Sequence, residues 1–212
     1  MTADFNRKII LEDGDEYLGY AFGDDGDRVC EIVFNTSMVG YQEILSDPSY
    51  TYQAVVMTYP LIGNYGTADD DYEREISTIG ALIVREYNDE PSNFRNTATL
   101  SQVMKKFKIP GIYGVDTRKL TRSIRDRGSR KVLITDIDTP LEKGLEILNK
   151  TDIPTDAVSK VSWLKMHTVY AKDEKYRVVA KERGMKNNIR CALNARGCTV
   201  TGVPWNSTAE QR

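Results

Sequence analysis

The stretch YQEILSDPSYTYQAVVMTYPLIG, residues 41–63, contains the local signals that decide the fold. Its opening YQEIL fits one helical turn, and Asp47-Pro48 ends that turn because the residue before a proline avoids the helical region. Residues 52–63 are rich in β-branched and aromatic side chains and close on a proline and a glycine. The stretch therefore predicts a short helix, a turn and a strand in direct succession.

Further strand and helix signals lie on both sides of this stretch. Residues 8–22 hold two alternating runs around Asp13-Gly14, which indicates a β-hairpin. Residues 79–87 form an apolar run that suits a strand buried on both faces. We also predict strands over 30–37, 112–115 and 132–135, and helices over 99–109, 116–128 and 139–150. The first part of the chain thus predicts a β-rich α/β fold.

The last part of the chain has a different pattern. Residues 151–175 are scattered polar residues with a proline, and they predict a linker. A strand at 176–180, an amphipathic helix at 185–197 and a strand at 198–205 follow. This order is one β-α-β unit, the start of a parallel sheet. Such a unit has no complete core by itself, so we expect its sheet to continue.

The composition is that of an ordinary soluble globular protein. The 212 residues are 40% hydrophobic and 28% charged, with a formal net charge of -2. This balance does not support a general role on nucleic acid or on a membrane surface. No apolar run approaches the roughly 18 residues that a membrane helix needs, and the first residues lack a signal core. We therefore predict a cytoplasmic protein that binds neither nucleic acid nor membrane.

Cysteine and histidine give no sign of a metal site or a catalytic device. Cys191 and Cys198 are seven residues apart with no histidine nearby, so we predict no zinc site. The only histidine, His167, lies in a polar stretch without periodicity and is predicted to be a surface or loop residue. Gly184, between a strand and a helix, fits an ordinary turn better than an anion site at the helix N-terminus.

Two further features remain open on the residues alone. The basic run from Arg118 to Lys131 fits a solvated helix face, a docking face for an acidic protein or, least well, a nucleic-acid site, because it lacks interleaved aromatic residues. Ser49 has no base nearby and no G-x-S-x-G context, so it fits turn capping better than nucleophilic catalysis.

Several long strings resemble one family. LEDGDEYLGYAFG (11–23), FNTSMVGYQEILSDPSYTYQAVVMTYPLIGNYG (34–66) and EPSNFRNTATLSQVMKKFKIPGIYGVDTRKLTRSIRDRG (90–128) resemble the N-terminal domain of the small subunit of glutamine-hydrolysing carbamoyl phosphate synthetase. RVVAKERGMKNNIRCALNARGCTVTGVPWNSTAEQ (177–211) resembles the opening of the family's class I glutamine amidotransferase domain. The order of these strings along the chain matches the family, which makes the resemblance specific.

The resemblance implies a domain organisation. Residues 1–150 would form the family's swivelling β/β/α-type N-terminal domain, and residues 151–175 a linker. Residues 176–212 would be an incomplete class I glutamine amidotransferase domain, represented by its first β-α-β unit. The segment 181–184, Lys-Glu-Arg-Gly, departs from the family's usual Asp-Phe-Gly at this place.

The resemblance also implies a function. The family's small subunit hydrolyses glutamine, and the ammonia passes through a tunnel to the large subunit. The large subunit makes carbamoyl phosphate from bicarbonate and ATP for arginine and pyrimidine synthesis. The expected partners are therefore the large subunit, in a heterodimer, and L-glutamine. No cofactor is expected on this chain, whereas ATP with magnesium or manganese is expected on the large subunit.

Only one site residue carries over. The serine of the family's D-P-S-Y string reaches into the amidotransferase site and helps to hold glutamine, which implies this role for Ser49. The family's Cys-His-Glu triad has no counterpart here, since Cys191 and Cys198 fall in the first helix and second strand of the domain. We therefore expect the 212 residues alone to be inactive, as part of a ligase subunit. The alternative is a stand-alone, non-catalytic docking module that binds the large subunit.

Overall fold

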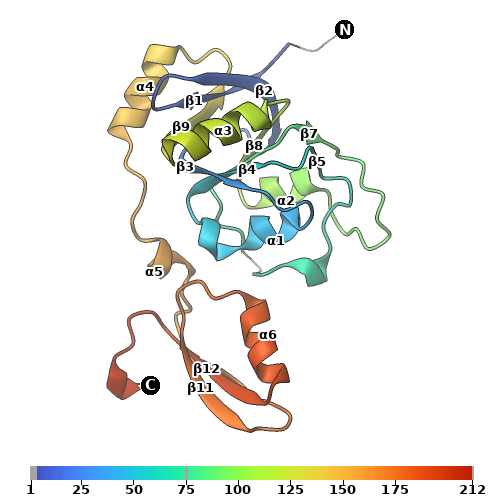
Figure 1. The fold of residues 1–212 in the computed structure, drawn as a ribbon, viewed down its shortest axis with the longest axis vertical. Coiled ribbons are helices and arrows are strands. Elements are labelled where there is room, and N and C mark those ends of the chain that lie inside the picture. Colours follow the sequence, from blue (N-terminus) through green and yellow to red (C-terminus); the bar gives the residue numbers. More distant parts are fainter. Residues whose placement is uncertain (1–3, 75, 212) are drawn as a thin grey trace.

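Seven strands close into a barrel that forms the larger part of the molecule (Figure 1). The computed structural model describes residues 4–74 and 76–211. Around the barrel the strand order is β1-β2-β8-β6-β4-β3-β9. The barrel closes because β1 pairs antiparallel with both β2 and β9. The chain is thus a mixed α/β protein, as predicted.

The barrel strands and their helices have the following bounds. The strands are β1 (Arg7–Leu11), β2 (Glu16–Gly23), β3 (Arg28–Asn35), β4 (Gln53–Met57), β6 (Ala81–Ile83), β8 (Pro110–Tyr113) and β9 (Lys131–Asp136). The short β5 (Leu61–Ile62) and β7 (Glu86–Tyr87) pair in parallel beside the barrel. The helices are α1 (Tyr41–Ser46), α2 (Leu100–Lys106), α3 (Thr117–Arg127) and α4 (Leu141–Lys150), with 3₁₀ turns η1 (Pro48–Tyr50) and η2 (Asp69–Asp71).

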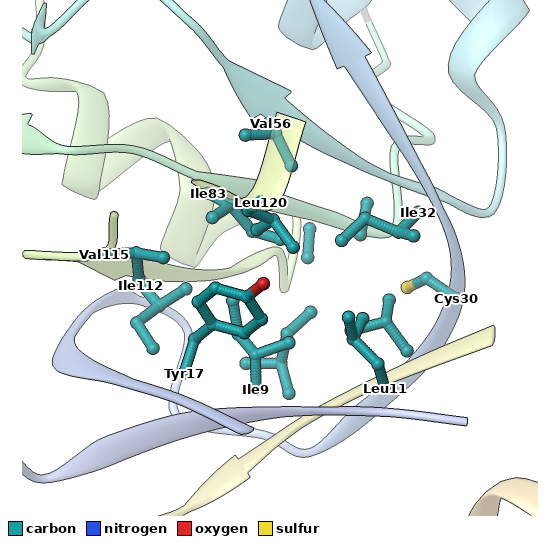
Figure 2. Close-up of a cluster of buried hydrophobic side chains, with 14 of the residues drawn as sticks. Ile9, Leu11, Tyr17, Cys30, Ile32, Val56, Ile83, Ile112, Val115 and Leu120 are labelled. Carbon is teal, nitrogen blue, oxygen red and sulfur yellow. The ribbon is translucent and has the colours of Figure 1, made fainter. Parts of the chain in front are cut away.

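The barrel interior is an apolar core (Figure 2). Successive side chains of a strand face opposite sides, so Ile9 and Leu11 of β1 point inward while Ile10 points outward. Leu120 and Ile124 of α3 belong to the same cluster as the inward side chains of the strands. The predicted apolar stripe on this helix is therefore confirmed as the face that packs onto the barrel core.

Helices cover the outside of the barrel in two places. On one side α1 and α2 pack against the outward side chains of β4 and β6, including Val55 and Leu82. On another side α4 packs Leu148 against Ile10 and Leu133. Strands β4 and β6 are therefore buried on both faces, which confirms the prediction for the apolar run at 79–87. That run ends earlier than predicted, because the chain leaves the barrel after β6 and pairs again as β7.

The last part of the chain forms a separate small sheet of three strands. The elements of this part are α5 (Ala157–Val161), β10 (His167–Val169), β11 (Tyr176–Lys181), α6 (Asn187–Ala195), β12 (Cys198–Val203) and η3 (Ala209–Gln211). Strand β12 is central, parallel to β11 and antiparallel to β10. The predicted strand-helix-strand order with parallel strands is confirmed. The range predicted as a linker, 151–175, contains α5 (Figure 1) and also the strand β10.

Candidate functional site

The D-P-S-Y string forms a tight turn at the end of α1. Asp47 has an extended backbone, so the helix stops there, as expected before a proline. The Asp47 carboxylate accepts a hydrogen bond from the Ser49 backbone N–H at 2.9 Å and so caps η1. The Thr51 hydroxyl donates to the Pro48 carbonyl at 2.7 Å and closes the turn from the other side. The serine is therefore held on a rigid backbone.

The Ser49 side chain takes no part in this network. Ser49 is exposed, whereas Asp47 and Pro48 on its N-terminal side are buried. Among residues 4–74 and 76–211 no hydrogen-bond partner is found for the Ser49 hydroxyl. A capping role in the turn belongs to the Asp47 carboxylate, so the turn-capping interpretation of the Ser49 side chain is wrong. Its hydroxyl is free to donate to, or accept from, a ligand.

The turn contacts the C-terminal sheet unit, which runs from α5 to η3, through Lys186. The Lys186 Nζ lies 2.7 Å from the Asp47 Oδ2, so one carboxylate both caps the turn and pairs across the junction between the barrel part, β1 to α4, and this sheet unit. The hydrogen bond from Lys186 to Asp47 raises the pKa of the lysine above its ordinary value, against the effect of burial. Ser49 thus lies two residues from an ion pair that joins the barrel part to the segment before α6.

A second ion pair joins the same two parts and is more buried. The Arg74 Nη2 lies 2.6 Å from Glu182 Oε1, and the Glu182 side chain is 0% exposed. The same Glu182 oxygen accepts the backbone N–H groups of Gly184 and Met185 at 2.8 and 2.9 Å. Arg74 also donates to the Val161 carbonyl. A single arginine of the barrel part therefore holds both α5 and the turn after β11.

Gly184 is required where the two parts touch. Its φ is +97°, and a Cβ there would lie 3.0 Å from Val161 and 3.3 Å from Pro48. Its amide is already occupied by Glu182. The turn interpretation of Gly184 is therefore confirmed, because no free amide remains at this residue for an anion. The Glu182 of the unusual Lys-Glu-Arg-Gly segment is explained by its bond to Arg74.

Two cavities lie along this junction. The smaller has a volume of about 250 Å³ and is lined by both Asp47 and Lys186, together with Asn35, Ser37, Val39, Gly40, Glu43, Ile44, Tyr50 and Glu73. The larger, of about 500 Å³, lies between η2 and α6 and is lined by Arg74, Lys186 and Trp163 among others. Ser49 lines neither cavity. The exposed Ser49 lies beside the junction.

The other candidate residues carry no chemistry in this structure. His167 is exposed in β10, edge-on to Trp163, which confirms the surface prediction. Cys191 is exposed in α6 and Cys198 is buried in β12, the elements predicted for them. Cys30 lies in the barrel core, and burial raises the pKa of its thiol to about 12, which disfavours the reactive thiolate. Within the described residues no group of three potential metal ligands is found.

The two ion pairs at the junction were not predicted from the sequence. Glu182 is separated from Arg74 by 108 residues, and Lys186 from Asp47 by an even longer interval, so no local pattern connects them. The one signal was the charged Glu182 two residues after the predicted strand YRVVA, because a charged residue at the end of a strand is buried only when it is paired. No helix in the described part of the chain has the length and apolar character needed to cross a membrane.

These features define a two-part α/β protein, a closed barrel with an appended β-α-β unit and a serine turn at their junction. The sequence model described as carbamoyl-phosphate synthase small chain, CPSase domain, matches residues 9–134, and the chain belongs to this family.

Curated relatives agree over almost the whole chain. The carbamoyl phosphate synthase small chain of Fusobacterium nucleatum subsp. nucleatum is 49% identical over 98% of this chain and 57% of its own length. The protein of the same name from Staphylococcus haemolyticus is 47% identical over 97% of this chain and 56% of its own. The pyrimidine-specific small chain of Bacillus subtilis is 46% identical over 97% and 56%. The chain thus spans a little over half the length of these relatives.

Proposed function

We propose that this chain acts as part of the small, glutamine-hydrolysing subunit of a carbamoyl phosphate synthase. The observation that carries the proposal is the 49% identity to a protein of that name over 98% of this chain. In this role the subunit hydrolyses glutamine and passes the ammonia to a large subunit. The large subunit would hold ATP with magnesium or manganese and use bicarbonate, so this chain would need no cofactor of its own.

The finer organisation follows the same proposal. The barrel with its helices would be the swivelling domain that docks on the large subunit. The sheet β10-β12-β11 with α6 would be the opening of a class I glutamine amidotransferase domain, whose parallel sheet extends beyond this first β-α-β unit. The pyrimidine-specific relatives support a role in pyrimidine synthesis, and arginine synthesis is the other expected use of the product. Such a subunit would work in the cytoplasm, where its ATP-dependent partner would find ATP.

Ser49 would supply a contact to the substrate glutamine. Its backbone is fixed by Asp47 and its exposed hydroxyl has no partner in the described residues, so glutamine would not have to displace an internal bond. The Asp47–Lys186 and Arg74–Glu182 pairs would keep the turn at a constant place relative to the amidotransferase part. Among the residues here Ser49 is the one proposed to touch substrate, and none is assigned to the catalytic triad.

The test is Ser49→Ala in the full-length subunit reconstituted with its large subunit. Loss of one neutral hydrogen bond of about 0.5–1.5 kcal/mol raises the KM for glutamine by roughly two- to twelvefold. Synthesis from ammonia should stay unchanged, because ammonia does not use the glutamine site.

Ser207→Ala is the matched control, since it removes a serine hydroxyl outside the D-P-S-Y turn. The proposal is refuted if Ser49→Ala lowers the rates with glutamine and with ammonia equally. It is also refuted if the control raises the KM for glutamine by the same factor.

A further inference from the structure

A third cavity lies away from the junction, against α3. It has a volume of about 410 Å³, within the range of roughly 300–1,000 Å³ that is common for ligand pockets. Its walls come from the segments after β4 and β6 and from one side of α3; the lining residues are Thr58, Pro60, Arg85, Thr117, Arg118, Thr121, Arg122 and Arg125. No carboxylate is among these residues.

The position of this cavity in the fold is one that commonly holds ligands. Strands β3, β4, β6 and β8 are parallel to one another, so their carboxyl ends meet at one edge of the barrel. Thr58 directly follows β4, Arg85 follows β6 by two residues, and α3 begins after β8. In sheets of parallel strands, ligands bind outside the carboxyl ends of the strands. The cavity lies at this edge.

Most of the positive charge around the cavity forms no ion pair with the described residues. Within the described chain, no ion pair or side-chain hydrogen bond involves the guanidinium groups of Arg85, Arg118 or Arg122. Arg125 alone is paired, with the exposed Asp126 at 2.8 Å. By contrast, Arg127 at the end of the same helix is paired with Asp13 and Asp15. Three unpaired arginines around one hollow favour an anion with several oxygens, since a guanidinium group binds phosphate or carboxylate through parallel hydrogen bonds.

Threonine hydroxyls complete the set of donors. Thr117 is 2% exposed and lines the cavity at the start of α3. One turn later the Thr121 Oγ1 is shielded from solvent and has no hydrogen-bond partner among the described residues. A threonine in a helix can adopt two χ1 rotamers, so this hydroxyl can turn toward an oxygen placed in the cavity. A buried hydroxyl without a partner costs stability, and a ligand oxygen would remove that cost.

We propose that this arginine-threonine pocket binds a small ligand that bears a phosphate group. Its phosphoryl oxygens would accept hydrogen bonds from the guanidinium groups of Arg85, Arg118 and Arg122 and from the Thr121 hydroxyl. The ligand is either inorganic phosphate or a phosphate monoester, which share this chemistry. In this proposal the arginines of α3 that line the cavity hold a ligand, rather than serving only as a solvated face or as a nucleic-acid site. The pocket does not depend on the glutamine role of Ser49.

A protein partner fits the pocket less well than a small ligand does. An acidic segment docking on α3 would use its exposed arginines, but it gives no role to the threonine hydroxyls on the inner side of the helix. A nucleic acid needs a longer basic track with aromatic side chains for stacking, and no aromatic residue lines this cavity.

The experiment is a binding titration of the full-length subunit, by calorimetry and phosphorus NMR at constant ionic strength. The probes are inorganic phosphate, ribose 5-phosphate, AMP and a glutamate-rich peptide. Arg122→Ala removes one charged donor, and Thr121→Val removes the hydroxyl at constant shape and charge. Arg183→Ala is the matched control, because it removes another exposed arginine, one that lies outside the pocket. Far-UV circular dichroism confirms that each variant is folded.

We expect at least one phosphate probe to bind with one ligand per subunit. Arg122→Ala should weaken this binding by at least about tenfold and Thr121→Val by about two- to tenfold, while Arg183→Ala leaves it unchanged. Tighter binding of an ester identifies an organic phosphate, and equal affinities identify the free anion. The proposal is overturned if none of the phosphate probes binds at a concentration of about 10 mM, because a site with a millimolar Kd would be occupied at that concentration. It is also overturned by equal loss in the Arg183→Ala control, or by tighter binding of the acidic peptide than of every phosphate.

Discussion

Replacing Arg74 by methionine should release the C-terminal sheet unit from the barrel part. Arg74 is the partner of Glu182, whose side chain is 0% exposed, at an N–O distance of 2.6 Å. Removing one member of a buried pair costs about 3–5 kcal/mol, because the other charge stays buried without compensation. Glu182 keeps two backbone N–H donors, so we expect the lower end, about 3 kcal/mol. Arg74→Met also removes the bond to the Val161 carbonyl.

The assay is urea unfolding followed by tryptophan fluorescence. Both tryptophans of the chain, Trp163 and Trp205, lie in the C-terminal part, so their fluorescence reports on that part selectively. Far-UV circular dichroism in the same titration is dominated by the barrel and its helices. We expect the fluorescence transition of Arg74→Met to move to lower urea and the dichroism transition to move less.

The matched control is Arg95→Met, which removes an arginine from an exposed pair. Arg95 lies 3.1 Å from Asp71, with side chains 44% and 37% exposed, and such surface pairs contribute about 0–1 kcal/mol. The double variant Arg74→Met with Glu182→Gln should recover part of the lost stability, because no unpaired buried charge remains. If the loss of stability for Arg74→Met is no larger than for Arg95→Met, the junction does not depend on the Arg74–Glu182 pair.

Three further outcomes follow from the packing and the ionisable groups. Leu120→Ala removes a fully buried side chain that α3 packs onto the barrel core. It should lower the free energy of unfolding, measured by urea titration, by about 2–5 kcal/mol. A loss below about 1 kcal/mol would contradict the buried position of Leu120. The pKa of Lys186 is raised by Asp47, so the pair stabilises the fold below the ordinary value of 10.5 and stops doing so as pH rises through the higher folded value. The difference in unfolding free energy between the protein and Lys186→Met should therefore shrink as the pH rises above 10.5, and a constant difference argues against the pair. Burial raises the pKa of the Cys30 thiol to about 12, whereas Cys191 is exposed. A thiol reagent at neutral pH should therefore label Cys191 in the folded protein and Cys30 only in urea. Mass spectrometry at early labelling times shows which of these two cysteines has reacted.

Local signals in the sequence predict most of the elements of the barrel part. The hairpin is confirmed, with Gly14 at a positive φ of 89° in its turn and Ile9 opposite Tyr17. The helix over 116–128 is confirmed with Asp116 as its N-cap and Gly128 as its C-cap residue. These elements are readable because capping and turn residues act within a few positions of the backbone groups that they satisfy.

Barrel closure could not be predicted in the same way. It requires β1 to pair with β9, which places Arg7 opposite Asp136. These two residues are separated in sequence by most of the barrel part of the chain. An apolar run indicates a buried strand but does not name its neighbours. The same limit applies to β10, whose three residues look like a polar loop until β12 supplies an edge for them to pair with.

The candidate site shows the same division. The turn around Ser49 was predicted from Asp47-Pro48, since the cap and the proline act locally. The ion pairs of Asp47 with Lys186 and of Arg74 with Glu182 depend on the packing of two distant segments, so they needed the structure. The role of Ser49 toward glutamine comes from the family resemblance, and its exposed, unpartnered hydroxyl is compatible with that role.

The most direct test of the proposed function is the nitrogen donor of the reconstituted enzyme. The rate of carbamoyl phosphate formation should be measured for the large subunit alone and with the full-length small subunit added, with glutamine or ammonia as the sole nitrogen source. We predict that the large subunit alone uses ammonia and that the small subunit confers synthesis from glutamine. Stable binding of the two subunits with synthesis from ammonia only would contradict this prediction and would leave a docking module without glutaminase activity.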